Sequence, residues 1–286
     1  MTDPGGDEGR DLFADKADWF DRMYDSPAGQ VRFRVLSSQM GECLPPPPAS
    51  VLDAGAGPGR YAAALAGGGY HVTLLDPSGP MLDRAKRAVA PHADQVRLEL
   101  GRVEEAADRF GANAFDVVLL HAVVCYVHDL DPVLAAVSTV LRRDGLLSLV
   151  FKNRSALAMR HVAGGDLDEA TRVLDDPREA GRLGIVNRAR ARSEVEGALA
   201  RHGFVVRRAW GLRIFTDLVG RDLSDADVDR LVELELRGAT TEPYRSVGRL
   251  WHLACERDTA TADREPWEVA AAAPLADELE AFLRSR

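Results

Sequence analysis

Short apolar runs alternate with helical patterns of apolar residues through the middle of the chain. The apolar runs predict strands over residues 51–54, 72–75, 96–100, 115–120 and 146–151. Helical spacing predicts helices over 60–66, 80–90 and 104–110. Strands separated by helices of this length are typical of right-handed β-α-β units, so we expect a parallel sheet. The uninterrupted runs at 115–120 and 146–151 indicate central strands covered on both faces.

One more helix is predicted before the strand at 146–151. Asp131 is expected as its N-cap, Pro132 as its first-turn proline, and Gly145 as the residue that ends it. The alternation then stops, and we interpret residues 152–192 as an insertion. Ser193 is the expected N-cap of a helix that His202 and Gly203 end. A strand over 204–210, a helix over 224–237 and a last strand over 247–256 follow, which gives seven strands in total.

The proline run from Pro45 to Pro48 predicts an extended polyproline spacer after a helical segment over 16–44. We therefore divide the chain into an N-terminal helical segment with the spacer (1–48), an α/β domain (49–257) and an acidic C-terminal extension (258–286). Both acidic ends, 1–18 and 256–286, are expected to lie outside the core.

Composition narrows the class of protein. The chain has 286 residues, of which 46% are hydrophobic and 28% charged, and this balance excludes a mostly disordered protein. The three scattered cysteines favour neither a disulfide framework nor a zinc site, and we expect no metal. No apolar stretch is long enough to span a membrane and the start of the chain is acidic, so we expect a cytoplasmic protein.

Charge is unevenly distributed. The net charge of −9 argues against broad nucleic-acid binding. Residues 177–215, however, hold nine arginines, no lysine and three acids, which gives this segment a charge of +6. Two interpretations stay open: a solvated helix face, or a patch that faces an anion or RNA. The planar fork of arginine favours the second slightly, because it grips phosphate and carboxylate through two hydrogen bonds.

A glycine-rich loop follows the first predicted strand. Gly55, Gly57 and Gly59 stand at alternate positions after Asp53 and Ala54. Glycine allows a tight turn there and lets a ligand approach the backbone. Arg60 stands where the dinucleotide-binding fingerprint has its last glycine, so the pattern is GxGxG instead. Asp76 closes the second strand, and its carboxylate is able to accept hydrogen bonds from both hydroxyls of a ribose.

These residues, with Leu74-Leu75-Asp76 and Ala114-Phe115-Asp116, resemble the motifs of class I S-adenosylmethionine-dependent methyltransferases. The resemblance covers about 51–256. It implies a seven-stranded, Rossmann-like α/β sheet whose last strand is antiparallel, and S-adenosylmethionine as cofactor. We expect the insertion at 152–192 and the region 224–241 to form a helical lid over the site.

Further segments resemble one family, the tRNA 5-carboxymethoxyuridine methyltransferases, which convert a wobble-uridine oxyacetate to its methyl ester. The segments are Gly29-Gln30-Val31-Arg32, His121-Ala122-Val123, the run MRHVAGGD at 159–166, Gly211-Leu212-Arg213-Ile214-Phe215, Glu242-Pro243-Tyr244 and Gly248-Arg249. The resemblance implies a cofactor site of Arg32, Gly55, Ala56, Asp76, Val103, Glu104 and His121, to which the glycine loop adds Asp53 and Gly57. Arg32 is expected to bind the methionyl carboxylate.

Methyl transfer to a carboxylate needs no general base, because the acceptor is already ionised at neutral pH. We therefore assign no catalytic residue. His121 is either a cofactor-site wall or a histidine satisfied at a strand end. Arg213 is expected to anchor the substrate carboxylate, with a surface salt bridge as the alternative. Asn153, Tyr244 and Arg249 complete the expected substrate site.

The sequence thus predicts a methyltransferase that acts on a carboxylate, with 5-carboxymethoxyuridine in tRNA as the first choice of acceptor. The alternative is a small-molecule O- or N-methyltransferase of specialised metabolism, which the net charge of −9 favours. A cofactor-binding regulator without turnover is a nonenzymatic alternative. We expect no membrane partner, and the pattern predicts no particular oligomeric state.

Overall fold

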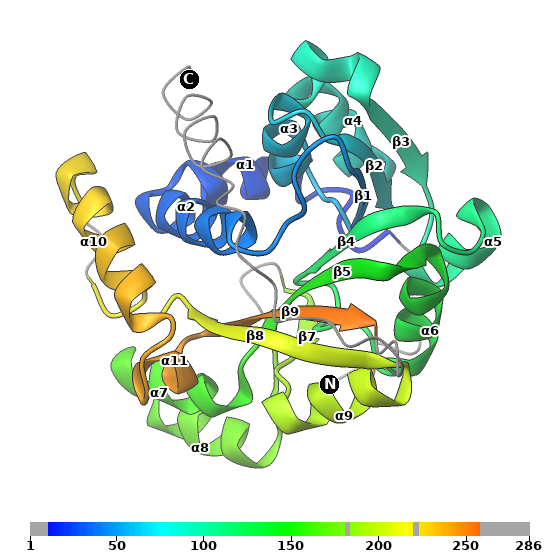
Figure 1. The fold of residues 1–286 in the computed structure, drawn as a ribbon. Coiled ribbons are helices and arrows are strands. Elements are labelled where there is room, and N and C mark those ends of the chain that lie inside the picture. The colour runs from blue at the N-terminus through cyan, green and yellow to red at the C-terminus, as the bar shows by residue number, and fades with distance from the viewer. Residues whose placement is uncertain (1–10, 181–183, 220–222, 258–286) are drawn as a thin grey trace.

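The computed structural model describes residues 11–180, 184–219 and 223–257, and Figure 1 shows their arrangement. The expected extension 258–286 and the first ten residues of the N-terminal segment lie outside the described residues.

A seven-stranded sheet forms the centre of the described chain. Its strands, in chain order, are β1 (Ser50–Ala54), β2 (His71–Asp76), β3 (Val96–Leu100), β4 (Phe115–His121), β5 (Leu141–Lys152), β8 (Phe204–Leu212) and β9 (Leu250–Arg257). Their spatial order is β3-β2-β1-β4-β5-β9-β8. The first five strands pair in parallel, and β9 is antiparallel to both of its neighbours. The predicted fold class is confirmed.

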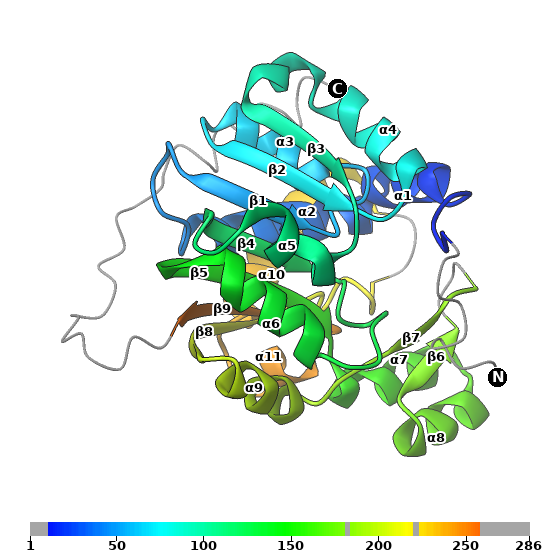
Figure 2. The ribbon, with the colours of Figure 1, turned by 90° about the vertical axis from the view of Figure 1, so that its right-hand side faces the viewer.

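Helices cover both faces of this sheet (Figure 2). One face packs against α2 (Pro27–Gly41), α3 (Arg60–Gly67), α4 (Gly79–Ala88) and α10 (Asp225–Gly238). The other packs against α5 (Ala106–Phe110), α6 (Asp131–Val140) and α9 (Arg192–Arg201). Because strand side chains alternate between faces, Val51 lies in the first of these cores and Leu52 in the second. This double cover explains the uninterrupted apolar runs of β4 and β5.

The N-terminal segment is a helical hairpin that packs onto the first face. Helix α1 (Ala17–Asp25) ends at Ser26, whose side chain caps α2 by accepting a hydrogen bond from Gly29 N at 3.1 Å. A Cβ at Gly29 would lie 1.9 Å from Met23 O, so only glycine permits this close turn. The proline run bends at Pro47 and Pro48, whose peptide bond is cis, and the expectation of a uniformly extended spacer was wrong.

The insertion follows β5 and lies near the carboxyl end of the sheet (Figure 2). It contains α7 (Leu157–Ala163), α8 (Leu167–Asp175) and a hairpin of β6 (Arg178–Ala180) and β7 (Val186–Arg188). Region 224–241 was expected to form part of the lid. Instead, Val228, Leu231 and Val232 of α10 pack in the core beneath α2. This region is therefore part of a core layer, and the expected lid does not include it.

Three predicted helix boundaries were wrong, because the residues expected at the helix ends do not lie there. Helix α6 has Leu130 at its N-cap position, with Asp131 inside the first turn. It ends at Val140, and Gly145 lies within β5 at an irregularity opposite β4, where a Cβ would come within 2.9 Å of Asp116 O. Helix α9 has Ala191 at its N-cap position, so Ser193 lies inside the helix. The helix α11 (Tyr244–Val247) precedes β9.

Candidate functional site

The glycine loop connects β1 to α3 at the carboxyl edge of the sheet. Gly55 and Gly57 have φ values of +78° and +54°, in the left-handed region that favours glycine. A Cβ at Gly55 would lie 2.3 Å from Val123 Cγ2, whereas a Cβ at Gly57 would meet no atom within 4 Å. Gly55 is thus required by packing against the β4 loop, and the space beside Gly57 is open to a ligand.

Asp76 at the end of β2 is bound to this loop. Its carboxylate accepts hydrogen bonds from Gly57 N at 2.8 Å and from Ser78 N at 2.9 Å. Burial raises the pKa of Asp76 to about 6, although the two backbone hydrogen bonds act in the opposite direction. Each oxygen keeps lone-pair capacity for one further donor, as two ribose hydroxyls would require.

Asp53 is buried at the end of β1, next to Asp76. Burial, and secondarily the charge of Asp76, raise the pKa of Asp53 to about 7. Within the described part of the chain no donor is hydrogen-bonded to the Asp53 carboxylate. A cationic ligand group would stabilise the ionised form and compensate for its burial.

Arg32 projects from α2 among uncharged polar side chains. Tyr24, Tyr61, Cys125 and Tyr126 lie close enough to interact electrostatically with its guanidinium. The Arg32 Nε atom is buried and makes no hydrogen bond, and no carboxylate among the described residues forms an ion pair with Arg32. A buried guanidinium without a carboxylate fits an anionic ligand group.

His121 at the end of β4 begins a buried chain of hydrogen bonds. His121 Nε2 lies 2.8 Å from Ser148 Oγ, which lies 2.9 Å from His252 Nε2. His252 Nδ1 lies 3.0 Å from Gln39 Oε1, and Gln39 Nε2 donates to Gly211 O at 3.3 Å. The chain therefore links β4, β5, β9 and α2 across one face of the sheet.

Donor and acceptor chemistry fixes both tautomers in this chain. Because the Gln39 amide nitrogen faces a carbonyl, its oxygen faces His252, and His252 Nδ1 must be the donor. Ser148 then donates to His252 Nε2 and accepts from His121 Nε2. His121 Nδ1 is left unprotonated, and it is buried without a partner. Burial lowers the pKa of His121 well below its usual value, and lowers the pKa of His252 to about 3. One ring nitrogen of His121 is thus satisfied, and the other is an acceptor for a ligand.

Arg213 and Arg249 share one carboxylate. Arg213 Nη2 donates to Asp217 Oδ1, and Arg249 Nη1 donates to Asp217 Oδ2 at 3.0 Å. The Arg213 side chain is 17% exposed and that of Asp217 is 18% exposed, so this is not a surface salt bridge. Burial, followed by the repulsion of Arg249, lowers the pKa of Arg213 to about 10, and Arg32 contributes in the same direction. Arg213 is therefore close enough to Arg249 and Arg32 to interact electrostatically with both.

The backbone of Arg213 is held in an unusual conformation. Its φ is +58°, a region that a side chain other than glycine enters at a cost of roughly 1 kcal/mol. Glu235 of α10 is fully buried behind it and accepts hydrogen bonds from the backbone nitrogens of Ile214, Phe215 and Thr216 at 2.8, 2.9 and 2.8 Å. The Glu235 carboxylate thus fixes the loop that follows Arg213.

A second ionic cluster lies beside Arg249. Lys152 Nζ donates to Glu179 Oε1 at 2.5 Å, and Arg160 pairs with the other oxygen of Glu179. Burial acts to raise the pKa of Glu179, but Lys152, and then Arg160 and Arg249, outweigh it and lower the pKa below its usual value. Glu179 is therefore already neutralised within the chain.

Two of the expected substrate residues make contacts within the protein. Both amide hydrogens of Asn153 are donated to backbone carbonyls, those of Ser246 at 2.9 Å and Gly248 at 2.8 Å, and Asn153 Oδ1 accepts from Ser155 N. The prediction that Asn153 donates to the substrate does not agree with this geometry, because both of its donors hold the segment that precedes β9. Tyr244 is 47% exposed, and its ring contacts that of Phe215.

Val103 is buried just after β3, and Glu104 beside it is exposed. Both therefore lie near the carboxyl edge that also carries Asp76, as their expected cofactor contacts require.

Most of the arginine-rich segment is paired internally. Arg190 is buried and donates to the carbonyls of Val124, Val127 and His128, with Glu194 as its ion-pair partner. Arg192 pairs with Glu196 and lies 5.0 Å from the ring of Trp251. Neither side chain is free for an anion, so the patch interpretation does not hold for these two residues.

The sequence analysis missed several residues that shape the site. Arg60, noted only as a departure from a fingerprint, donates to Asp25 at 2.7 Å and lies over the Tyr24 ring, which ties α1 to the glycine loop. Glu235 carried a usable signal, because it continues the helical spacing of Val228, Leu231 and Val232 on the buried face of α10. Ser148, His252 and Gln39 carried none, because their contacts join distant parts of the sequence.

Three side chains of the site suit the charged and hydroxyl groups of S-adenosylmethionine. Arg32 offers an unpaired guanidinium to a carboxylate, Asp53 an unpaired carboxylate to a cation, and Asp76 acceptors to a ribose. Across residues 11–180, 184–219 and 223–257, no cluster of histidine, cysteine and acidic side chains has the form of a metal site. The helices in these same ranges include none that is long and apolar enough to cross a membrane.

Comparisons with known proteins agree with this geometry. Residues 52–149 match the profile of a family described as "Methyltransferase domain". The tRNA 5-carboxymethoxyuridine methyltransferase of Escherichia coli (strain K12) is 31% identical over 252 residues, covering 86% of this chain and 95% of that protein.

Two solved structures share the fold at low identity. One is the 1,6-didemethyltoxoflavin-N1-methyltransferase of Burkholderia thailandensis with S-adenosylhomocysteine, with a TM-score of 0.57 and 18% identity over 90% of this chain and 92% of that one. The other is geranyl diphosphate C-methyltransferase from Streptomyces coelicolor A3(2), also with S-adenosylhomocysteine, with a TM-score of 0.53 and 16% identity over 88% of this chain and 86% of that one.

Proposed function

Because the chain belongs to the tRNA 5-carboxymethoxyuridine methyltransferase family of class I S-adenosylmethionine-dependent methyltransferases, we propose that its methyl acceptor is a carboxylate oxygen. We further propose that this carboxylate is the oxyacetate of 5-carboxymethoxyuridine at the wobble position of a tRNA, and that the product is the methyl ester. Methyl transfer with S-adenosylmethionine as cofactor is the activity common to the family.

The sharing of Asp217 by Arg213 and Arg249 carries this proposal. Two guanidinium groups and one carboxylate leave one positive charge without a counter-ion in the described chain. Arg32 adds to the positive field that Arg213 experiences. An acceptor carboxylate would supply the missing negative charge, and charge-assisted hydrogen bonds from a guanidinium would fix its orientation.

Methyl transfer to a carboxylate requires of the chain mainly that it position the carboxylate and the methyl donor. S-adenosylmethionine, which Arg32, Asp53 and Asp76 would hold, would supply an electrophilic methyl group on a sulfonium whose leaving group is a neutral thioether. No proton moves, which agrees with a site whose histidine is held neutral. The chain's own residues hold the carboxylate, through Arg213, and exclude water from the reacting atoms.

Support for a tRNA acceptor comes from the family relative, which shares 31% identity along almost its whole length. A small-molecule acceptor with a hydroxyl or amine would have no negative charge for Arg213 to bind, and would require a base to take its proton. The surplus positive charge therefore favours the carboxylate acceptor.

A panel of matched acceptors tests the proposal. The purified protein is incubated with S-adenosylmethionine and, in parallel, with tRNA containing 5-carboxymethoxyuridine, with the free nucleoside, and with the nucleoside whose carboxylate is replaced by a carboxamide. We expect methylated product from the first two and at least a hundredfold lower kcat/KM for the carboxamide. Equal turnover of the carboxamide, or methylation of hydroxyl or amine acceptors alone, would contradict the proposal and favour the small-molecule alternative.

A further inference from the structure

Arg188 differs in its ion pairing from the other described arginines in and directly after the β6–β7 hairpin. Arg178, Arg190 and Arg192 pair with Asp176, Glu194 and Glu196. Arg188 forms no ion pair with any residue that the structure describes, and its Nε atom is buried without a hydrogen-bond partner. A guanidinium that is partly withdrawn from water and left unpaired is poised to bind an anion.

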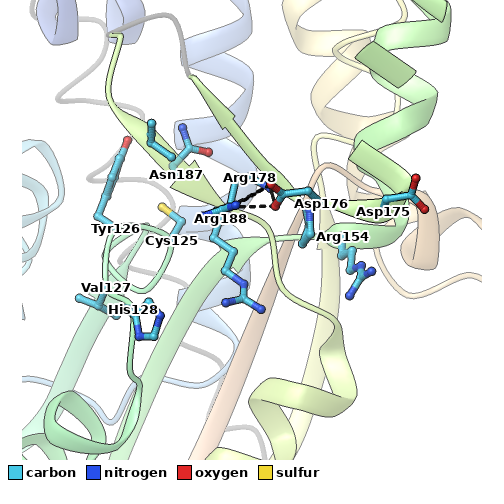
Figure 3. A pocket seen from close by; sticks show the side chains of 12 residues that line it. Cys125, Tyr126, Val127, His128, Arg154, Asp175, Asp176, Arg178, Asn187 and Arg188 are labelled. Atoms are coloured by element: carbon cyan, nitrogen blue, oxygen red, sulfur yellow. Dashed lines mark hydrogen bonds and ion pairs between the residues drawn. The ribbon is translucent and has the colours of Figure 1, made fainter. Parts of the chain in front are cut away.

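Arg188 lines a hollow between the hairpin and the loop that follows β4. The hollow has a volume of about 460 Å³ and is bounded by Cys125 to His128, by the end of α8 and by β7. Figure 3 shows the Arg188 side chain between Tyr126 and Cys125 on one side and Asp176 on the other. This volume suits a ligand of nucleotide size.

None of the other charged residues that line the hollow neutralises the positive charge of Arg188. Asp176 accepts three hydrogen bonds from the Arg178 side chain, at 2.9 Å to Oδ1 and at 3.0 and 2.8 Å to Oδ2. Asp175 is exposed and points away from Arg188 in Figure 3. Arg154 adds a second guanidinium that forms no ion pair within the described chain. The lining therefore carries a net charge of +1, from three arginines and two aspartates.

The hollow adjoins the acceptor site. Arg188 N donates to Cys125 O at 2.8 Å, which fixes the hairpin to the β4 loop. Cys125 and Tyr126 form a wall of the hollow, and their side chains also lie within the electrostatic reach of Arg32. Tyr126 is similarly close to Arg249. If the acceptor carboxylate is bound at Arg213 and Arg249, the rest of the substrate would thus extend toward Arg188.

We propose that this hollow binds a phosphodiester group of single-stranded RNA next to the acceptor nucleotide, with Arg188 as its ligand. The inference rests on the proposed function, because it takes the acceptor carboxylate to lie at Arg213. A phosphodiester fits better than a second carboxylate because a nucleotide acceptor carries its phosphates several ångströms from the reacting base edge. A loop of RNA presents such a phosphate without duplex pairing.

Binding and turnover are measured separately to test this subsite. An anticodon stem-loop RNA with unmodified uridine at the wobble position reports binding without any methyl transfer, by fluorescence anisotropy at several salt concentrations. Arg188→Ala should weaken this binding about tenfold and lower the salt slope by about one contact. Arg188→Lys should keep most of the slope, because it keeps the charge. Arg192→Ala is the matched control and should bind RNA as the parent does, because Arg192 is paired with Glu196.

Turnover of the free 5-carboxymethoxyuridine nucleoside, which has no phosphate, separates the subsite from the reaction. Arg188→Ala should lower kcat/KM about tenfold for tRNA and leave the value for the nucleoside within about twofold. An equal loss on both acceptors, unchanged RNA binding, or competition by inorganic phosphate as strong as that by RNA would overturn the proposal. If the parent binds RNA through Arg188 but methylates no carboxylate, the subsite stands and the proposed function fails.

Discussion

Arg213, which directly follows β8, donates a hydrogen bond to Asp217, four residues further along the chain. The backbone of Arg213 has a positive φ of +58°. The contact leaves Asp217 able to bind Arg249 as well, and the pair of arginines therefore keeps a surplus charge. The predicted properties of the site follow from this arrangement.

Replacement of Arg213 tests the acceptor contact. Arg213→Ala removes the guanidinium that we place on the substrate carboxylate, and it should lower kcat/KM by roughly 2–4 kcal/mol, about thirtyfold to a thousandfold. Affinity for S-adenosylhomocysteine, measured by calorimetry, should stay within about twofold. A variant with parental kcat/KM would show that Arg213 serves only to hold Asp217.

Glu235 should act on the acceptor through Arg213. Glu235→Gln replaces one acceptor oxygen by an amide that faces backbone N–H groups, and should cost about 1–3 kcal/mol of unfolding free energy. Because the loop after Arg213 is loosened, we expect a higher KM for the acceptor with cofactor affinity unchanged. Glu233→Gln on the same helix is the control, since the Glu233 side chain is 75% exposed. Parental KM in a folded Glu235→Gln protein would exclude a positioning role.

Asp76 should dominate cofactor affinity among the loop residues. Asp76→Ala removes the acceptor expected for the ribose and also frees Gly57 N and Ser78 N, and should weaken S-adenosylhomocysteine binding by roughly 1.5–3 kcal/mol. Asp83→Ala, an exposed acid on α4, is the control. Calorimetric titration of both variants measures the effect, and an unchanged dissociation constant for Asp76→Ala would remove Asp76 from the cofactor site.

The histidine chain predicts a fixed tautomer. Burial lowers the pKa of His252 to about 3 and the pKa of His121 well below its usual value, so both rings should be neutral at pH 7. Nitrogen-15 NMR should find the proton of His121 on Nε2, and Ser148→Ala should shift this resonance because it removes the acceptor. Titration of His121 near pH 6.5, or a proton on Nδ1, would refute the hydrogen-bond assignment.

The sheet was predictable because each strand and helix is encoded by local patterns. The runs that became β4 and β5 are apolar on both faces. Gly55, Gly57 and Gly59 form a loop in which each glycine has a positive φ. Gly145 misled the prediction because a glycine that permits close approach to Asp116 O has the same local appearance as one that ends a helix.

Candidate site residues could be placed from the sequence only where a residue acts through its own position. Asp76 closes a strand, and Arg213 follows one, so both could be placed from the sequence. The pairing of Arg190 with the carbonyls of the β4 loop, and of Glu235 with the loop after Arg213, depends on contacts between distant segments. Charge counts cannot distinguish an arginine that is buried in such contacts from one that is free, as Arg190 and Arg188 show.

Identification of the methylated atom is the decisive test of carboxylate methylation. The protein is incubated with tRNA containing 5-carboxymethoxyuridine and S-adenosylmethionine carrying a labelled methyl group, and the RNA is digested to nucleosides for mass spectrometry before and after mild alkali. The account predicts label only on 5-carboxymethoxyuridine, as an ester that mild alkali hydrolyses to release labelled methanol. Label that survives alkali, or that lies on any other nucleoside, would contradict carboxylate methylation.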